Sequence, residues 1–459
     1  MKVIRNIPFD RLEVGMEAEA HRLCVADDLY VFAHASGNLN PLHIPDADGD
    51  GDGRPEAVAP SAWIGSLISS VLGNDLPGPG TIYQSQTFRF LGQAHAGDNL
   101  AIKVRLKEKG ADRRAIFDTW VELEDGTRIL EGEAVVTAPE KEVSFDASDV
   151  PGLSVRSHVH FDALLAEAEP LPPIETAVVA PEDANSLGGA LLAMKHTLIH
   201  PILIGDRHRI AAAAHELEAD IAGCSVIHVE THRDAAAMGV KLVLEGRAKA
   251  LMKGFLHTDE LLGQVVKSDG GLRVGRRLSH VFVFDVPGMP HLIFVTDAAI
   301  NISPDLETKV DIVQNAIDLA RTLGIETPKV GILSAVETVN PKIPSTIDAA
   351  VLSKMAERGQ IRSGIVDGPL AMDNAIDMGA ARTKGIKSMV AGQAEILVAP
   401  NLESGNMLAK ELTFVAHAEA GGIVIGARCP IILTSRSDND KARLASCAIA
   451  ALYAERKDR

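Results

Sequence analysis

Two separated groups of residues carry side chains whose types and spacing could support chemistry. The first is the loop from Ser36 to His43, which reads S-G-N-L-N-P-L-H. His43 offers a ring nitrogen that can accept a proton near neutral pH. Asn38 can orient a water molecule, but an amide, unlike a carboxylate, has no useful basicity near pH 7. The loop therefore has the parts for acid–base work on water, with His43 as its basic group.

The second group stands near the end of the chain, where Ser435 and Arg436 follow an apolar run and precede a predicted helix at about 441–456. Arginine binds phosphate oxygens in pairs and keeps its charge. A strand-to-helix loop adds free backbone N–H groups and a favourable helix dipole. These residues predict an anion site. The alternative is a capping serine followed by a solvent-exposed arginine.

The elements of the first third of the chain are predicted to form an antiparallel sheet around one helix. The segment 101–109 alternates between apolar and basic side chains, as a strand with one buried face does. The segments 115–124 and 127–137 flank Asp125-Gly126, a strong hairpin signal. An apolar stripe at helical spacing covers 61–72. The basic face of 101–109 suits either a phosphate-bearing ligand or solvent.

The pattern of apolar and polar residues changes after a proline-containing boundary at 138–173. Short, uniformly apolar runs recur between longer helical segments, which indicates parallel strands covered on both faces. Several of these runs end in a polar residue, and ligands of open α/β sheets bind beyond the carboxyl ends of strands. We expect at least three of these residues to converge on a ligand, although each could instead cap the next helix: Asp297, Ser334, Asp367, Asn401 and Ser435.

Bulk properties narrow the class of protein. A chain of 459 residues exceeds what one core usually serves, so two or three domains are expected. The net charge of -17 argues against nucleic acid as a partner. No uninterrupted apolar run is long enough to span a membrane, and the first residues are too polar for a secretory signal. The 4 cysteines stand far apart, which favours a reducing cytoplasm over a disulfide framework.

The loop Phe32 to His43 resembles that of the MaoC-like, hot-dog-fold (R)-specific enoyl-CoA hydratases, and the resemblance covers roughly residues 10 to 140. It implies an aspartate and a histidine that add water across an enoyl-CoA double bond. His43 matches the histidine, Asn38 stands in the aspartate's place, and Asn40 is expected to bind substrate. Losing a positioned base costs on the order of 100 to 10,000-fold in rate, so acyl-CoA binding without efficient hydration stays open.

Motifs in the rest of the chain resemble the phosphate acetyltransferase and butyryltransferase family, from about Thr176 to Lys457. They are Asp367-Gly-Pro-Leu, Pro400-Asn-Leu-Glu-Ser-Gly-Asn406 and Leu433-Thr-Ser-Arg-Ser-Asp438. The resemblance implies acyl transfer between CoA and inorganic phosphate, with Ser435 and Arg436 as the matched active-site pair. Residues expected to contribute to substrate binding are Asp297, Asp367, Asn401, Gly405 and Asn406.

The resemblance leaves two roles without a strict match. A second arginine is expected near the cleft, and Arg273, then Arg276, are the preferred candidates. The acetyltransferase branch also carries an aspartate, proposed to deprotonate the CoA thiol, where this chain has Ala442. The candidate substitutes in the same loop are Asp438 and Asp440, neither of which is a strict match. No cofactor or metal is expected, since CoA thioester and phosphate are the substrates.

The expected fold is thus an α+β hot-dog domain followed by a two-lobed α/β domain with mostly parallel sheets. The predicted boundaries are 1–143 for the hot-dog domain, 144–173 for a linker and 174–459 for the transferase domain. Its lobes are expected at about 155–278 plus 422–459, and at 279–421. A homodimer or higher homo-oligomer is implied by the family resemblance.

Three alternatives compete with this interpretation. Acyltransferase-like domains also occur as non-catalytic acyl-CoA sensors, and Ala442 would fit such a module. An NAD-linked dehydrogenase ranks last, because no G-x-G-x-x-G loop joins a strand to a helix. Asp46-x-Asp48-x-Asp50-Gly51 begins like an EF-hand loop, but its twelfth position is Ala57, so a flexible acidic insertion is preferred to a calcium site.

Overall fold

The computed structural model describes residues 3–146, 150, 153, 155, 158–433 and 439–457. The chain forms two compact units, Met1–Val155 and Arg156–Arg459. Each unit has a hydrophobic core of its own. Among the described residues no helix has the length and apolar character needed to cross a bilayer.

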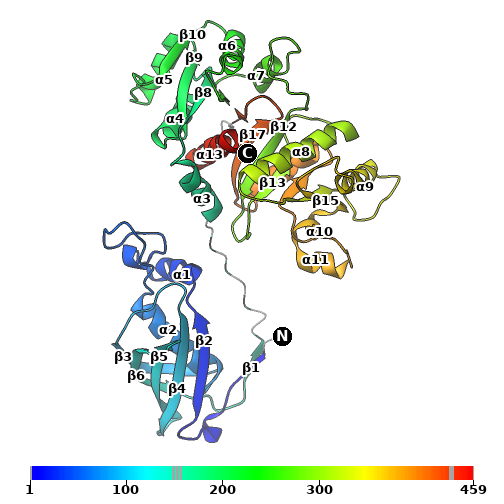
Figure 1. Cartoon of the computed structure of the whole chain (residues 1–459). Coiled ribbons are helices and arrows are strands. Elements are labelled where there is room, and N and C mark those ends of the chain that lie inside the picture. Colours follow the sequence, from blue (N-terminus) through cyan, green and yellow to red (C-terminus); the bar gives the residue numbers. More distant parts are fainter. Residues whose placement is uncertain are drawn as a thin grey trace. The chain divides into compact units, whose positions relative to one another are not determined.

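The N-terminal unit is an antiparallel sheet of five strands in the order β2-β4-β5-β6-β3, with helix α2 packed on one face (Figure 1). Its long helix is buried through Trp63, Ile64, Ile68, Val71 and Leu72, the predicted apolar stripe. The elements are β1 (Val3–Arg5), β2 (Glu17–Leu23), α1 (Ala26–Ser36), η2 (Pro41–His43), α2 (Ser61–Asn74), β3 (Ile82–Phe90), β4 (Asn99–Lys109), β5 (Arg114–Leu123), β6 (Arg128–Thr137) and β7 (Ser144–Asp146).

Strand β4 confirms the predicted alternation. Its apolar side chains, including Ile102 and Val104, are buried, and three of its basic side chains are ion-paired on the other face. Lys109 instead donates to the Leu12 carbonyl at 2.8 Å. Lys103 pairs with Glu122 at 2.9 Å and Lys107 with Glu133 at 2.6 Å. These pairs neutralise the basic row within the sheet, which favours an ordinary solvated face over a docking strip for CoA phosphates.

The turn between β5 and β6 follows the predicted hairpin chemistry. Gly126 has a φ of 84°, which glycine adopts without a steric penalty. The Asp125 carboxylate accepts a hydrogen bond from the backbone N–H of Thr127 at 2.8 Å. The turn therefore fixes the register of the two strands.

The C-terminal unit is built on one sheet in the order β10-β9-β8-β11-β18-β17-β12-β13-β16-β14-β15 (Figure 1). Its strands are β8 (Ile174–Val179), β9 (Ile199–Gly205), β10 (Ser225–His228), β11 (Ala250–Lys253), β12 (Ser279–Asp285), β13 (Ile293–Thr296), β14 (Lys329–Leu333), β15 (Ile365–Leu370), β16 (Ile396–Val398), β17 (Glu419–Ile425) and β18 (Ile431–Ile432).

Helices pack against this sheet, and α13, which is apolar along most of its length, is largely buried. The helices are α3 (Val159–Ala168), α4 (Ala184–Lys195), α5 (Arg207–Glu216), α6 (His232–Leu244), α7 (Thr258–Val265), α8 (Leu306–Thr322), α9 (Pro344–Glu357), α10 (Met372–Ile376), α11 (Met378–Thr383), α12 (Leu402–Phe414) and α13 (Asp440–Arg456).

The sheet is mixed, and the reversal lies at its centre. Strands β10, β9, β8, β11 and β18 are mutually parallel, as are β13, β16, β14 and β15. The three pairings that join these groups, through β17 and β12, are antiparallel. The expectation of mostly parallel sheets is therefore met within each group, but one continuous sheet runs through both. Consequently the carboxyl ends of the two groups point in opposite directions.

The range 144–173, expected to form a linker, contains secondary structure at both ends. Residues 144–146 form β7, which pairs with β1 in the N-terminal unit. Helix α3 packs against α13 and buries Phe161 and Leu164 in the core of the C-terminal unit. The local proline content marked the boundary, but the tertiary contacts of these elements set its length.

Candidate active site

The predicted pair Ser435 and Arg436, together with Asp438, lies outside the described residues. Both flanks of this loop are described. Leu433 follows the end of β18, and Asn439 caps α13 by accepting a hydrogen bond from the Ala442 N–H at 2.8 Å. The segment 434–438 thus connects the carboxyl end of a central strand to the N-terminus of a buried helix, as the sequence predicted.

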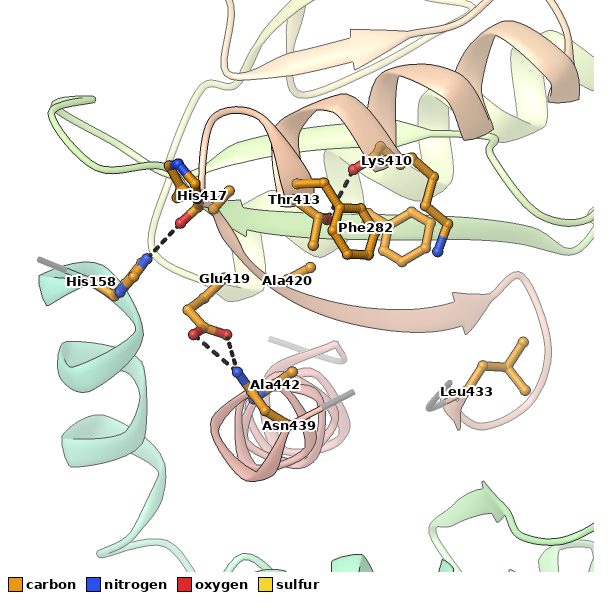
Figure 2. Close-up of a pocket in the computed structure, with 13 residues that line it drawn as sticks. His158, Phe282, Lys410, Thr413, His417, Glu419, Ala420, Leu433, Asn439 and Ala442 are labelled. Atoms are coloured by element: carbon orange, nitrogen blue, oxygen red, sulfur yellow. Dashed lines mark hydrogen bonds between the residues drawn. The ribbon is translucent and has the colours of Figure 1, made fainter. Parts of the chain in front are cut away.

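A cavity of about 480 Å³ opens beside these flanks (Figure 2). Leu433, Asn439 and Ala442 line it, so it adjoins both ends of the segment 434–438. Phe282 of β12 and the last turns of α12 supply most of its apolar wall. The cavity has room for a small ligand that is partly apolar.

Two pairs of residues that line this cavity are joined by hydrogen bonds. Glu419 accepts hydrogen bonds from the Asn439 amide at 3.1 Å to each carboxylate oxygen, and the His158 Nε2–H donates to the His417 carbonyl at 3.0 Å (Figure 2). Lys410 also lines the cavity. The Glu419 contact anchors the start of α13 to the start of β17, and so fixes one end of the segment 434–438.

Ala442 lines the cavity where the acetyltransferase branch is expected to carry its aspartate. Its methyl group cannot take a proton from a thiol. Glu419 is the carboxylate that the described part of this cavity contains, and its oxygens face Asn439. Ala442 therefore cannot act as the thiol base. Of the two predicted substitutes, Asp438 lies outside the described residues, and Asp440 has an exposed carboxylate 3.5 Å from the Arg443 guanidinium.

Arg273 and Arg276 lie in a different cavity, of about 430 Å³, together with Arg277 and Asn301. Arg276 forms an ion pair with Asp318 at 2.5 Å, so part of its charge is already balanced. Arg273 is exposed, and its backbone forms an isolated bridge with Ala427. The two arginines share one cavity, but Leu433 and Asn439 line another.

Asp297 is buried at the end of β13 and is held by local hydrogen bonds. Its carboxylate accepts from the backbone N–H groups of Ala299, Ile300 and Asn301 at 2.9, 3.0 and 3.2 Å. The Asn301 side-chain amide donates to it as well, at 2.5 Å. Asp297 therefore shapes the turn after β13 and fixes Asn301, which lines the arginine cavity.

Gly405 and Asn406 fasten helix α12 to this same turn. A Cβ on Gly405 would lie 2.5 Å from the Asp297 carbonyl oxygen, so only glycine permits the close approach. The Asn406 amide donates to the Ala298 carbonyl at 3.2 Å. Asn401 caps α12 by accepting from the Ser404 N–H at 2.9 Å. The structure thus brings these four predicted residues together, with their described polar contacts made within the protein.

Ser334 and Asp367 also make local contacts. The Ser334 hydroxyl lies 2.8 Å from that of Ser345, and Asp367 accepts from the Gly368 N–H at 2.8 Å. Ser334 follows the end of β14, which is parallel to β13 and β16, so it shares an edge with Asp297 and Asn401. Contrary to the prediction, Asp367 does not end its strand, because it lies inside β15, level with Gly331 of β14. Their convergence on a ligand stays a prediction.

The register across the centre shows that Leu433, at the end of β18, does not lie at that edge. Thr296, Val281, Ile423 and Ile432 lie in one row of neighbouring strands. From this row the chain runs to Asp297 in one direction and to Leu433 in the other. Strands that alternate in direction present their carboxyl ends on opposite sides. Sequence reasoning missed this because strand direction is not written in a local pattern.

His280 is a buried residue that sequence reasoning did not single out. It lies on β12 beside Phe282, with ring centroids 4.3 Å apart, and its Nδ1 has no hydrogen-bond partner among the described residues. Burial lowers the pKa of His280 to about 4, against the opposing charge of Asp297. The imidazole is therefore neutral at physiological pH, and packs behind the aromatic wall of the cavity.

In the N-terminal unit, His43 is oriented by the backbone. Its Nδ1–H donates to the Val58 carbonyl at 2.8 Å, which leaves Nε2 as the basic nitrogen. The Asn38 side-chain oxygen accepts from the Asn40 N–H at 3.3 Å, and that of Asn40 accepts from the Leu42 N–H at 3.3 Å. The loop therefore presents one oriented base, while both predicted amides shape the backbone turn.

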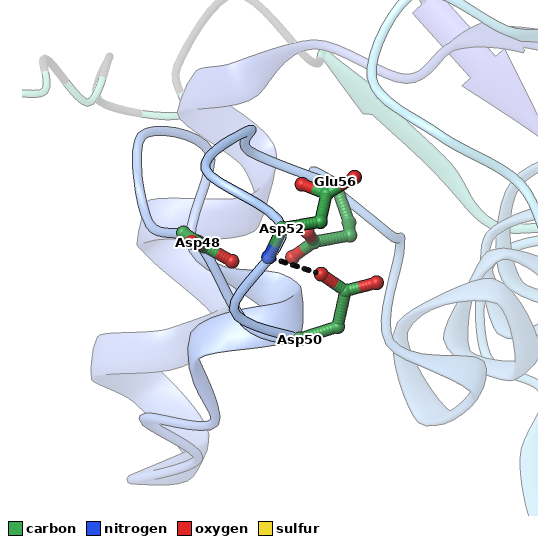
Figure 3. Close-up of side chains that lie close together, drawn as sticks. All are labelled: Asp48, Asp50, Asp52 and Glu56. Carbon is green, nitrogen blue, oxygen red and sulfur yellow. Dashed lines mark hydrogen bonds between the residues drawn. The ribbon is translucent and has the colours of Figure 1, made fainter.

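The acidic insertion gathers four carboxylates: Asp48, Asp50, Asp52 and Glu56 offer oxygens that all lie within 4.8 Å of one another (Figure 3). Backbone N–H groups of Gly51 and Gly53 donate to Asp48, which lowers the pKa of that carboxyl. The EF-hand count began at Asp46, which is not a member of this group. The insertion thus forms a turn held by hydrogen bonds to Asp48, and its flexibility stays a prediction.

Comparison with known proteins defines the class of this chain. Residues 229–451 match the family model described as "Phosphate acetyl/butaryl transferase". The phosphate acetyltransferase of Rhizobium meliloti is 58% identical over 297 residues, which cover 65% of this chain and 94% of that protein. The chain belongs to the phosphate acetyl/butyryl transferase family, and it is an acyltransferase.

Two solved structures are similar to separate parts of the chain. A branched-chain phosphotransacylase from Enterococcus faecalis V583 is 31% identical, with a TM-score of 0.55, and the match covers 61% of this chain and 99% of that one. The R-hydratase PhaJ1 from Pseudomonas aeruginosa is 35% identical, with a TM-score of 0.32, over 34% of this chain and 100% of that one.

Proposed function

We propose that the C-terminal unit transfers a short acyl group between CoA and inorganic phosphate. The observation that carries the proposal is the family membership, with 58% identity to a phosphate acetyltransferase. The cavity beside Leu433 and Asn439 supports it, because it adjoins the loop that holds Ser435 and Arg436. The alternative of a non-catalytic acyl-CoA sensor is not favoured, because the chain is an acyltransferase.

In the proposed reaction a phosphate oxygen attacks the carbonyl carbon of the thioester. The new C–O bond forms, the C–S bond breaks, and its electron pair leaves with the CoA sulfur, which then takes up a proton. Arg436 would hold the phosphate, since a guanidinium binds two oxygens at once. Ser435 and nearby backbone N–H groups would stabilise the negative charge that develops on the carbonyl oxygen.

The test is release of free thiol from acetyl-, propionyl-, butyryl- and crotonyl-CoA, with and without phosphate. Phosphate-dependent release from at least one saturated acyl-CoA is expected, together with formation of the acyl phosphate. Binding of acyl-CoA without phosphate-dependent release of thiol would contradict the proposal and favour the alternative of a non-catalytic acyl-CoA sensor. The relative rates for the chain lengths would assign the substrate among acetyl, propionyl and butyryl groups.

We further propose that the N-terminal unit binds acyl-CoA and hydrates enoyl-CoA weakly. The specific observation is the orientation of His43, whose Nδ1–H is engaged by Val58 so that Nε2 is left as a base. Asn38 supplies no second base. The test of this proposal is an assay of crotonyl-CoA hydration, in which the absorbance of the conjugated thioester is monitored as it disappears. A hydration rate as high as that of hydratases that carry the aspartate would show that Asn38 does not lower the activity.

The remaining expectations concern partners and setting. We propose a homodimer or higher oligomer in the cytoplasm, with acyl-CoA and phosphate as ligands and no cofactor or metal. The large side chains of Phe88 and Phe90 are exposed on the edge strand β3, as on a surface available to a second copy. All of Cys24, Cys224, Cys429 and Cys447 are free thiols. Light scattering in solution measures the assembly.

A further inference from the structure

The cavity beside Leu433 and Asn439 has an apolar wall to which the proposed function has not yet given a role. Helix α12 lies on one side of the cavity and the first turn of α13 on the other (Figure 2). Four of the lining residues are alanines, which come from α12, from the start of β17 and from α13: Ala409, Ala418, Ala420 and Ala442. Their short side chains leave a space of about 480 Å³.

Phe282 of β12 adds a large aromatic ring to this wall, and its position is fixed by neighbours on the same strand. Its ring centroid lies 4.3 Å from that of His280 and 5.6 Å from that of Phe284. Both neighbours are buried, whereas Phe282 is partly exposed where it lines the cavity. Closely packed aromatic rings restrain one another. The Phe282 ring therefore forms a boundary that can limit how far a ligand enters.

The alanines of this wall belong to a hydrophobic core, yet they border open space. Ala409 and Ala418 are members of the core beneath α12, and Ala420 and Phe282 pack against that core. Protein interiors are close-packed and contain few voids larger than a water molecule. Apolar side chains arranged around a space of this size are typical of a site for the apolar part of a ligand.

The charged groups that line the cavity have contacts of their own. The Lys410 ammonium lies 5.8 Å from the centre of the Phe414 ring, and Phe414 is 67% exposed. The Glu419 carboxylate accepts hydrogen bonds from the Asn439 amide. A charge that lost its water to an entering hydrocarbon chain would oppose binding. The part of the cavity suited to a hydrocarbon chain is therefore the wall of alanines and Phe282.

The size of the cavity bears on the length of such a chain. The single methyl group of an acetyl thioester would leave most of a cavity of about 480 Å³ to water. Each further methylene group that enters an apolar site removes apolar surface from water, which strengthens binding by about fourfold. The cavity therefore favours acyl groups of more than two carbons.

We propose that this cavity binds the acyl chain of the thioester, that Ala420 and Phe282 limit the length of the chain, and that the preferred substrates carry saturated acyl groups longer than acetyl. The inference rests on the proposed function and deepens it by assigning the substrate class. Leu433 and Ala442 line the cavity and flank the segment 434–438, where the thioester carbonyl is proposed to react. The pantetheine arm of CoA is the other part of the substrate that the cavity could hold, and every acyl-CoA shares it.

The main test replaces Ala420 by Leu, which fills part of the cavity. We compare kcat/KM for phosphate-dependent thiol release from acetyl-, propionyl-, butyryl- and hexanoyl-CoA at saturating phosphate. In the wild type this value should rise by about fourfold for each methylene group from acetyl- to butyryl-CoA. Ala420→Leu should lower the value for butyryl-CoA by about tenfold or more and leave that for acetyl-CoA nearly unchanged. Phe282→Ala enlarges the cavity and should shift the preference toward hexanoyl-CoA, which keeps the proposal testable if Ala420→Leu folds poorly.

A matched control is Ala211→Leu, which adds the same side chain at an exposed position of α5, away from the cavity. It should leave the relative kcat/KM values of the four thioesters unchanged. An equal loss for all four thioesters in Ala420→Leu would assign the cavity to the pantetheine arm and overturn the proposal. A wild-type preference for acetyl-CoA, or wild-type relative values in both cavity variants, would also overturn it.

Thermal unfolding of the full chain provides a test that does not depend on turnover. At equal ligand concentration, butyryl-CoA should raise the melting temperature of the wild type more than acetyl-CoA does, because it binds more tightly. Ala420→Leu should remove this difference, and since the variant leaves the N-terminal unit intact, the change reports on the cavity. The same difference in wild type and variant would contradict the proposal. These shifts report binding even if the wild type released no thiol, so failure of the proposed reaction can be told apart from failure of the acyl site.

Discussion

The two units place their candidate catalytic groups by different means. In the N-terminal unit, Asn38 and His43 stand five positions apart on one loop, and backbone contacts within and beside that loop orient them. In the C-terminal unit, the candidate groups come from strand ends and helix starts that are far apart in sequence. A local site can thus lose its chemistry through one substitution, whereas a dispersed site can gather further charged groups from neighbouring elements.

The largest effect is expected from Arg436→Ala. Removing the guanidinium should lower acyl phosphate formation by roughly 100 to 1,000-fold, because charge stabilisation at the reacting oxygens is lost. The measurement is phosphate-dependent thiol release. Arg247→Ala, at an exposed position of the same unit, is the control. Equal rates in both variants would show that Arg436 has no catalytic role and that the active site lies elsewhere in the C-terminal unit.

The next effect sharpens the local site. Asn38→Asp should increase crotonyl-CoA hydration by about 100-fold, since it adds a basic carboxylate near an already oriented His43. His43→Asn in the same background should abolish the gain. If Asn38→Asp leaves the rate unchanged, the asparagine is not what limits this unit, and acyl-CoA binding becomes its more economical role.

The third prediction uses the buried His280. Its folded-state pKa is about 4, whereas that of an unfolded histidine is about 6.5. As the pH falls from 6.5 to 4, the unfolded chain takes up a proton that the folded chain does not, so stability declines by about 3 kcal/mol. His280→Gln should remove this part of the decline. The difference between the two unfolding free energies, followed by denaturant titration, isolates it from other groups, and parallel pH profiles would refute it.

The fourth prediction concerns the packing of α12 on the turn after β13. Gly405→Ala should destabilise the C-terminal unit by about 1 to 3 kcal/mol, because the new methyl group would collide with the Asp297 carbonyl. Gly263→Ala in α7 is the control, since a Cβ at that position would have nothing within 4 Å. That change should be neutral or stabilise the helix by about 0.5 kcal/mol. Similar stabilities for both variants would show that α12 can shift enough to accommodate the added methyl group.

The smallest effect is expected from removing metal ions. Acyl phosphate formation and crotonyl-CoA hydration should both be unchanged by a chelator, since the proposed steps use arginine, serine and histidine. Each of these two rates is measured before and after dialysis of the protein against EDTA. A loss of hydration alone would direct attention to the acidic turn of Asp48, Asp50, Asp52 and Glu56.

Much of the local structure could be read from single segments. The alternation in β4, the Asp125-Gly126 turn and the stripe of α2 were all predicted, and each depends on neighbours within a few residues. Strand β11, which ends at Lys253, was not predicted, because its four residues carry little pattern. Of the C-terminal site, the sequence indicated the Ser435–Arg436 loop, and the structure describes the strand and helix that flank it.

The sequence by itself determined which segments become strands and helices, and which motifs link the chain to its family, because those features are written in local periodicity and in runs of consecutive residues. The tertiary structure decided the reversal of strand direction between β13 and β18, and hence which polar strand ends can share an edge. It also decided that Arg443 is buried against Gly189 and Asn185. Burial and charge balance depend on partners distant along the chain, and no local pattern specifies them.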